Sequence, residues 1–241
     1  MSDNWLTLKK KPGTVRPMLT IVDMSHKDFR FELGDFLMTQ LYIRGDHSKA
    51  IAESVLLMMS APYLKYHVPA HVLRMFEFAK VHNINLSVVE KLAIWFHDAI
   101  YYPGKNGIES ASVDLMYGFL KPHIGNGFGL GILRDAEDGI MATAEHFLPT
   151  HSLSESSLRF SKVMDLDLCN FALERDQVWA LAMDVKEEYK GIWTPQGSAE
   201  LLSKFVDGRT VFRSKEFVAF EEKAASNLKW LISELRAMGA S

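Results

Sequence analysis

Apolar residues recur at helical spacing along nearly the whole chain, and this periodicity limits the folds open to it. In the clearest segment, Val88, Val89, Leu92, Ala93 and Phe96 lie on one helical face. Ser87 and Glu90 have the spacing of a capping box at its start. The segment ends near Asp98, ahead of a Tyr-Tyr-Pro-Gly turn that helices do not cross. No stretch alternates convincingly with a period of two residues, so we expect an all-α fold without a sheet.

Other segments with the same periodicity predict the remaining helices. A helix over 69–81 tolerates Pro69 only in its first turn. Further helices are expected at about 29–42, 47–60, 109–121, 131–147, 155–172, 175–191, 196–206 and 214–237. The glycine-rich run 125–131 is too short to link two domains. The 241 residues suit one domain, so we expect an N-terminal extension over 1–27 and a single-domain helical bundle over 28–241.

Composition and charge exclude several classes of partner. The net charge is −3 with basic and acidic residues interspersed, which argues against binding to a nucleic-acid polymer. No run of about 18 apolar residues is present, so we expect no membrane partner. Lys9 to Lys11 are followed by no apolar segment, which argues against a signal peptide. Cys169 is the only cysteine, so no intrachain disulfide can form and a cytoplasmic location is the default expectation.

Histidines and aspartates gather in a pattern typical of metal sites. His67 and His71 are four residues apart, His97 and Asp98 are adjacent, and Asp165 and Asp167 flank one leucine. Imidazole and carboxylate together suit a divalent ion such as manganese, iron, zinc or nickel. The structural alternative for His97 and Asp98 is an ordinary polar helix end, with the histidine near the negative end of the dipole.

The order of these motifs resembles the HD superfamily of metal-dependent phosphohydrolases. The resemblance rests on Tyr66-His67-x-x-x-His71-Val72-x-Arg74, Trp95-Phe96-His97-Asp98-Ala99-Ile100-Tyr101, Glu109-Ser110-Ala111, Ala142-Thr143-x-x-His146 and Asp165-x-Asp167. Glu187-Glu188-Tyr189, Gly208-Arg209 and the segment from Phe217 to Leu228 are similar to one branch of that superfamily. The resemblance implies an HD-type helical bundle around a divalent metal, with cobalt and magnesium as further candidates.

The resemblance implies a ligand set for that metal. His71 matches the superfamily's first ligand, a histidine followed by x-x-Arg, and His97 and Asp98 form the dyad. Alternate residues on a helix point about 200° apart, so only one of Asp165 and Asp167 can face the ion. Asp167 is favoured, with Asp165 in reserve. Capping of a helix is the alternative role for either aspartate.

Other polar residues near the motifs are candidates for catalysis and substrate binding. Glu109 is expected to orient water or act as a general base, or else to complement a helix dipole. Arg74 and Lys105 are candidates to hold phosphate. The expected substrate-binding residues are Tyr66, His67, Tyr101 and His146. His123 and His151 also lie between the dyad and Asp167, but only His146 falls in a matching motif, so a second metal is not favoured.

These assignments predict a metal-dependent phosphohydrolase that cleaves a phosphate ester with metal-bound hydroxide. A nucleotide is the substrate class that the resemblance most suggests, although no motif in the sequence indicates recognition of a base. The partner is therefore a small phosphorylated molecule, and a homodimer is one option for the assembly. The alternative is a non-catalytic metal- or nucleotide-binding regulator on the same fold. A third and weaker option is an oxygenase that uses two irons.

Overall fold

The computed structural model describes residues 26–125, 128–206 and 210–240 of the chain. These residues form eleven α-helices and four short 3-10 helices, and no strand occurs among them. The α-helices are α1 (His26–Gln40), α2 (Gly45–Met58), α3 (Pro69–Val81), α4 (Val88–Phe96), α5 (Ile108–Leu120), α6 (Leu130–Thr143), α7 (Glu155–Arg159), α8 (Ser161–Asp167), α9 (Arg175–Glu188), α10 (Pro195–Ser203) and α11 (Glu221–Gly239). The prediction of an all-α helical domain is confirmed.

Helix α4 begins at the capping box that the sequence predicts. The Ser87 hydroxyl accepts a hydrogen bond of 3.2 Å from the Glu90 backbone N–H, and the Glu90 carboxylate accepts one of 2.7 Å from the Ser87 N–H. These bonds satisfy two of the donors that a helix start leaves without a partner. Lys162 adds an ion pair of 2.8 Å to the same carboxylate, which ties the start of α4 to α8.

Helix α4 is buried on nearly all sides. Residues 92–96 are all buried, and the helix packs against α3, α5, α6 and α8. A helix that is apolar all round is stable only inside a protein, where other elements cover each face. The His97-Asp98 pair follows directly, so the polar dyad is placed in the interior rather than at a solvated end.

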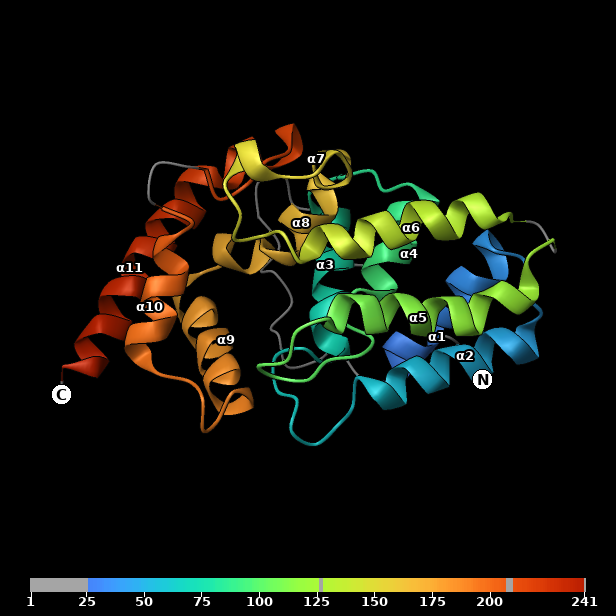
Figure 1. Ribbon diagram of the computed structural model, residues 1–241, viewed down its shortest axis with the longest axis horizontal. Coiled ribbons are helices and arrows are strands. Elements are labelled where there is room, and N and C mark those ends of the chain that lie inside the picture. The colour runs from blue at the N-terminus through green and yellow to red at the C-terminus, as the bar shows by residue number, and fades with distance from the viewer. Residues whose placement is uncertain (1–25, 126–127, 207–209, 241) are drawn as a thin grey trace, which may run out of the picture.

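The helices form two groups on either side of this centre. In Figure 1, α1 and α2 lie together at one end of the molecule and α9, α10 and α11 gather at the other. The C-terminal group has its own smaller core, made of Leu173, Val178, Leu181, Ala199, Leu231, Ile232 and Leu235. None of the described helices has the length and apolar character that crossing a membrane requires.

Most of the predicted helices have boundaries that differ by a few residues in the structure, and three of the differences bear on the site. The segment 155–172 is divided at Phe160, whose backbone angles (φ −100°, ψ 22°) end α7 before α8 begins. The Phe160 side chain is buried against α6, and this tertiary contact overrides the local helical periodicity. The predicted helix 131–147 ends at Thr143, so His146 lies in the turn that follows it. The last predicted helix, over 214–237, begins as a 3-10 helix over Lys215–Phe220, and α11 follows it from Glu221.

The contact between α4 and α6 depends on a glycine. A Cβ atom at Gly139 would lie 2.8 Å from Ala93 Cβ and 3.1 Å from a ring carbon of Phe160, closer than carbon atoms pack. Gly118, in the interior of α5, has no atom within 4 Å of the same position. The two glycines therefore differ in packing while sharing a helical backbone.

We predict opposite effects of the same substitution at these two positions. Gly118→Ala should raise the free energy of unfolding by up to about 1 kcal/mol, because alanine is the better helix former. Gly139→Ala should lower it by about 1 kcal/mol, because overpacking costs roughly 1–3 kcal/mol and outweighs the helical gain. Urea unfolding of both variants measures the difference. Equal stabilisation by both substitutions would contradict this account of the interface.

Candidate metal centre

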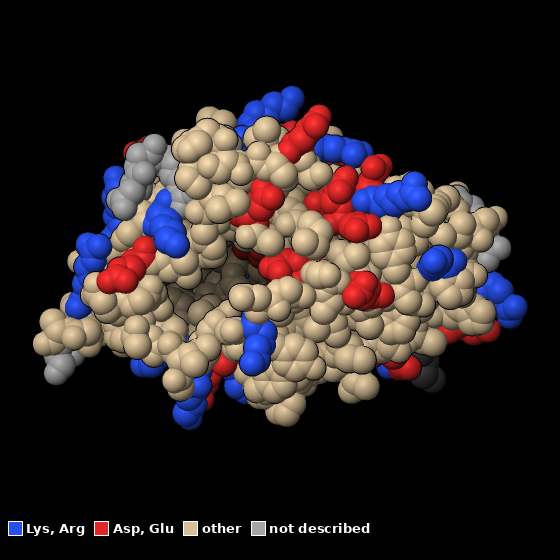
Figure 2. Space-filling model, in the orientation of Figure 1, with Lys and Arg blue, Asp and Glu red and all other residues tan. Residues whose placement is uncertain are grey.

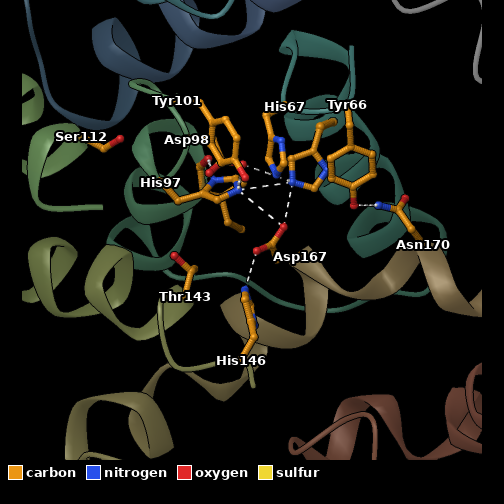
Figure 3. Close-up of polar contacts among 12 residues, drawn as sticks. Tyr66, His67, His97, Asp98, Tyr101, Ser112, Thr143, His146, Asp167 and Asn170 are labelled. Carbon is orange, nitrogen blue, oxygen red and sulfur yellow. Dashed lines mark hydrogen bonds and ion pairs between the residues drawn. The ribbon is translucent and has the colours of Figure 1, made fainter. Parts of the chain in front are cut away.

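Four side chains from three parts of the chain meet at the end of α4. His71 comes from the first turns of α3, His97 and Asp98 follow α4, and Asp167 ends α8. One ligand atom from each lies within 4.8 Å of the others, a grouping that could hold a metal ion. Figure 3 shows His97, Asp98 and Asp167 converging, with His146 on the far side of the Asp167 carboxylate. The structure thus brings together all four residues that the sequence predicts as ligands.

The distances within the group fit ligands that share one ion. His71 Nε2 lies 3.3 Å from His97 Nε2 and 2.7 Å from Asp167 Oδ1. His97 Nε2 lies 3.0 Å from Asp98 Oδ2. Two imidazole nitrogens and two carboxylate oxygens facing one point are the donor set that divalent transition metals prefer.

The tautomer of His97 suits a ligand. Its Nδ1 lies 2.9 Å from the Ile94 carbonyl oxygen, which can only accept a hydrogen bond. Nδ1 therefore carries a proton, and when Nε2 carries none its lone pair points toward the group. A backbone carbonyl that fixes the second ring nitrogen in this way is a common partner of metal-bound histidines.

The buried charges favour a cation at the centre of the group. Burial disfavours a charged His97, but Asp98 and Asp167 outweigh it and hold the pKa of His97 well above its usual value. Burial also opposes the charge on Asp167, yet the histidines around it hold the pKa of that carboxyl well below its usual value. The carboxylates therefore stay ionised and attract positive charge, either as a proton on an imidazole or as a metal ion.

His146 braces Asp167 rather than joining the four. Its Nε2 lies 2.6 Å from Asp167 Oδ2, while the other oxygen of that carboxylate faces His71. A second partner of this kind fixes the orientation of a ligand carboxylate. His146 also lines the cavity beside the group, where the sequence predicted a substrate contact. His123, by contrast, packs its ring against His47.

Asp165 turns away from the group. Its carboxylate accepts hydrogen bonds from the backbone N–H groups of Arg213, at 2.9 and 3.0 Å, and of Ser214, at 2.6 Å. It thereby anchors the segment that leads into the C-terminal helices. The geometry favours Asp167 as the fourth ligand and gives Asp165 a structural role.

His67 is held by a glutamate that the sequence reasoning left without a role. Glu188, at the end of α9, accepts hydrogen bonds of 2.8–3.0 Å from the three backbone N–H groups of residues 65–67 and contacts His67 Nδ1. The Tyr101 ring stacks on the His67 ring with centroids 3.5 Å apart, and the Tyr101 hydroxyl contacts that of Tyr189. The motif Glu187-Glu188-Tyr189 was the only sequence signal for this network, and nothing in it indicated a partner 121 residues away.

Tyr66 and Arg74 lie close to His71, and the ring centroids of Tyr66 and His71 are 5.0 Å apart. The Tyr66 hydroxyl accepts a hydrogen bond of 2.7 Å from the Asn170 side chain. The Arg74 guanidinium is buried, lies 5.9 Å from the Tyr66 ring centroid and does not line the cavity. Lys105 is exposed and does not line it either. The structure therefore places neither predicted phosphate-binding residue where it would touch a ligand in the cavity.

A cavity of about 500 Å³ opens beside the ligand group. Figure 2 shows the surface hollowed between the region of α9 and α10 and the central helices, with both acidic and basic side chains near its edge. Glu109, in the first turn of α5, lines this cavity together with Asp98 and Asp167. The polar part of the lining consists of Tyr66, His67, Asp98, Tyr101, Glu109, Thr143, His146, Asp167, Asn170, Tyr189 and Ser198.

Comparison of the chain with protein-family models, curated proteins and solved structures found no match. The chemistry of the site therefore has to be argued from its own geometry.

We predict that Asp165 contributes to stability by accepting hydrogen bonds from backbone N–H groups. Asp165→Ala leaves two buried N–H groups without a partner, which should lower the free energy of unfolding by about 2–4 kcal/mol. The control is Asp114→Ala, on the exposed side of α5, which should change stability by less than about 0.5 kcal/mol. Denaturant unfolding measures both, and similar stabilities for the two variants would refute the anchoring role of Asp165.

Proposed function

We propose that this chain is a metal-dependent phosphohydrolase of the HD superfamily. The observation that carries the proposal is the joint placement of the four-residue group and Glu109 on one cavity. Two histidines and two carboxylates leave positions on a six-coordinate ion for water and for a substrate oxygen. A divalent ion in such an open site lowers the pKa of its water and polarises a phosphoryl oxygen.

The side chains around the group have separable roles in this proposal. His71, His97, Asp98 and Asp167 hold the ion, and His146 fixes the Asp167 carboxylate. Glu109 accepts the proton of the attacking water, or orients that water by a hydrogen bond.

His67 and Tyr101 contact the substrate. Because Glu188 holds Nδ1 of His67, the remaining ring nitrogen is the one available to a bound ligand. Tyr101 packs on that ring and lines the same cavity.

The ion is proposed to be manganese, iron, zinc, nickel, cobalt or magnesium. Mixed nitrogen and oxygen ligands favour the transition metals over magnesium, which prefers oxygen. A reducing cytoplasmic location belongs to the same proposal, because the single cysteine, Cys169, is buried and unpaired.

The discriminating experiment is a screen of phosphate esters with each of these metals added, read as released phosphate. The alternative of a non-catalytic regulator predicts ligand binding without turnover. Glu109 favours the enzyme, because a carboxylate on the cavity wall has no role in holding the four-residue group together. Turnover that requires added metal and is lost with a chelator supports the hydrolase, whereas binding without turnover supports the regulator.

Loss of a ligand should remove the metal while the fold persists. We predict that His97→Ala and Asp98→Asn each retain less than about one tenth of the wild-type metal content, because each ligand belongs to one coordination sphere. His123→Ala is the matched control, since that ring packs against His47 and not against the site. Elemental analysis measures the metal, and circular dichroism checks the helix content. Equal metal in all three variants and wild type would overturn the site.

Glu109→Gln separates the catalyst from the ligands. The change keeps the size of the side chain and removes the base, so we predict a fall in kcat of roughly 10²–10⁴. Metal content and KM should change little, because no ligand to the ion is lost. Asp167→Asn, in contrast, should weaken metal binding itself. A Glu109→Gln enzyme with near-normal kcat would leave Glu109 as a helix-terminal charge.

A further inference from the structure

The cavity beside the ligand group has two chemically different halves. The half near α4 and α8 carries the carboxylates, histidines and tyrosines described above. The other half is walled mainly by the three C-terminal helices and the segments that join them, with Phe147 from the turn after α6 and Phe171 from the 3-10 helix before α9. Most of its side chains are apolar. These are Phe147, Phe171, Val178, Leu181, Ala182, Val185, Trp193, Leu201, Leu202, Phe205, Leu231 and Leu235.

The apolar half is more than a patch of ordinary core. Several of its side chains, including those of Ala182, Val185 and Trp193, are only partly buried although they face a cavity inside a folded domain. Exposed apolar surface of this kind is stabilised when a ligand displaces its water. Binding pockets of several hundred cubic ångströms with such walls are typical of sites for small apolar ligands.

The charges of the cavity limit the anion that can enter it. Asp98, Glu109 and Asp167 line it, while none of its described lining residues is a lysine or an arginine. A bound ion could balance one phosphate group at the ligand end. A diphosphate or triphosphate would bring further negative charge beside carboxylates, with no cationic side chain on the described lining to offset it.

The same walls fit a nucleoside poorly. A base and a ribose present several donors and acceptors, and each would lose its water against aliphatic and aromatic side chains. On the described lining of this half, hydroxyls are carried by Ser198 in α10 and by Tyr189 after α9, and the Tyr189 hydroxyl already contacts that of Tyr101, so few of those groups would find a partner.

From this division we infer that the substrate is a phosphomonoester of an apolar alcohol. Its phosphate would lie at the ligand group, and its hydrocarbon part would fill the compartment between α9, α10 and α11. The inference rests on the proposed function for the phosphate, but the apolar compartment is a separate observation. The inference changes the expected substrate from a nucleotide to an ester with a single phosphate and a hydrophobic chain.

Non-hydrolysable phosphonates test the inference without relying on turnover. The affinity of the full chain, with manganese present, is measured by calorimetry for methyl-, propyl-, hexyl- and octylphosphonate. Each buried methylene should tighten binding roughly three- to fourfold until the compartment is full. The analogue of AMP in which a methylene group replaces the ester oxygen should bind more weakly than octylphosphonate. Affinity that does not change with chain length, tighter binding of the AMP analogue, or no binding across the series would each overturn the inference.

A polar substitution in the compartment provides the matched test. Val185→Asn places an amide on the apolar wall at a partly buried position, so folding is expected to tolerate it. It should weaken octylphosphonate binding roughly five- to tenfold and leave methylphosphonate unchanged, because Val185 belongs to the apolar half of the cavity and methylphosphonate has no hydrocarbon chain to bury there. The control is Val218→Asn, at a residue that is 72% exposed. Equal effects on both ligands, or the same effect from both variants, would count against the compartment.

The two proposals fail separately. If affinity rises with chain length but no alkyl phosphate is hydrolysed with any of the metals, the hydrolase proposal is wrong and the apolar compartment stands. If a polar phosphomonoester is turned over while the alkyl series is flat, the hydrolase proposal stands and the substrate class inferred here is wrong.

Discussion

The burial of α4 is the constraint on which the rest of the structure depends. A helix with apolar residues on nearly all sides has to be covered by α3, α5, α6 and α8, and this leaves its C-terminal end inside the protein. His97 and Asp98 stand at that end. Their polar atoms can be buried at acceptable cost only when other polar groups meet them. The helices that cover α4 provide those groups, because α3 carries His71 and α8 carries Asp167.

Asp167 connects the parts of the site. One of its oxygens faces His71 and the other faces His146, so a single carboxylate joins α3, α8 and the turn after α6. The same end of α8 is tied to the C-terminal helices through Asp165, two residues earlier. A change in the position of α8 would therefore move a ligand and the wall of the cavity together.

The ligand group could be predicted from the sequence because the motifs that mark it are short, local patterns. The dyad follows a strongly periodic segment with a capping box, and the alternate spacing of Asp165 and Asp167 already implied that only one could face the ion. Motif order then favoured Asp167, and the geometry agrees. The break at Phe160 was not predictable from periodicity, because it arises from a contact with another helix.

The contacts that the sequence reasoning missed join residues far apart in the chain. Glu188 holds residues 65–67, and Asn170 donates to Tyr66, yet neither pair has a spacing signal. Arg74 shows what spacing alone cannot give: its place one turn after His71 predicts a phosphate contact, whereas the structure places the buried guanidinium 5.9 Å from the centroid of the Tyr66 ring. The apolar compartment could not be predicted either, because the apolar periodicity of α9, α10 and α11 indicates helices but not how these helices pack together.

The bond between Asp165 and the backbone of residues 213–214 has a consequence for synthesis. Chains emerge from the ribosome N-terminus first, and the four ligands all lie within the first 167 residues. Asp165 can accept its hydrogen bonds only after residues 213 and 214 have been made, and α10 and α11, which complete the cavity wall, are made at about the same stage. A nascent chain can thus bring its ion-binding residues together early, but α8 is fixed in place, and the compartment closed, only after the segment from α10 to α11 has been made.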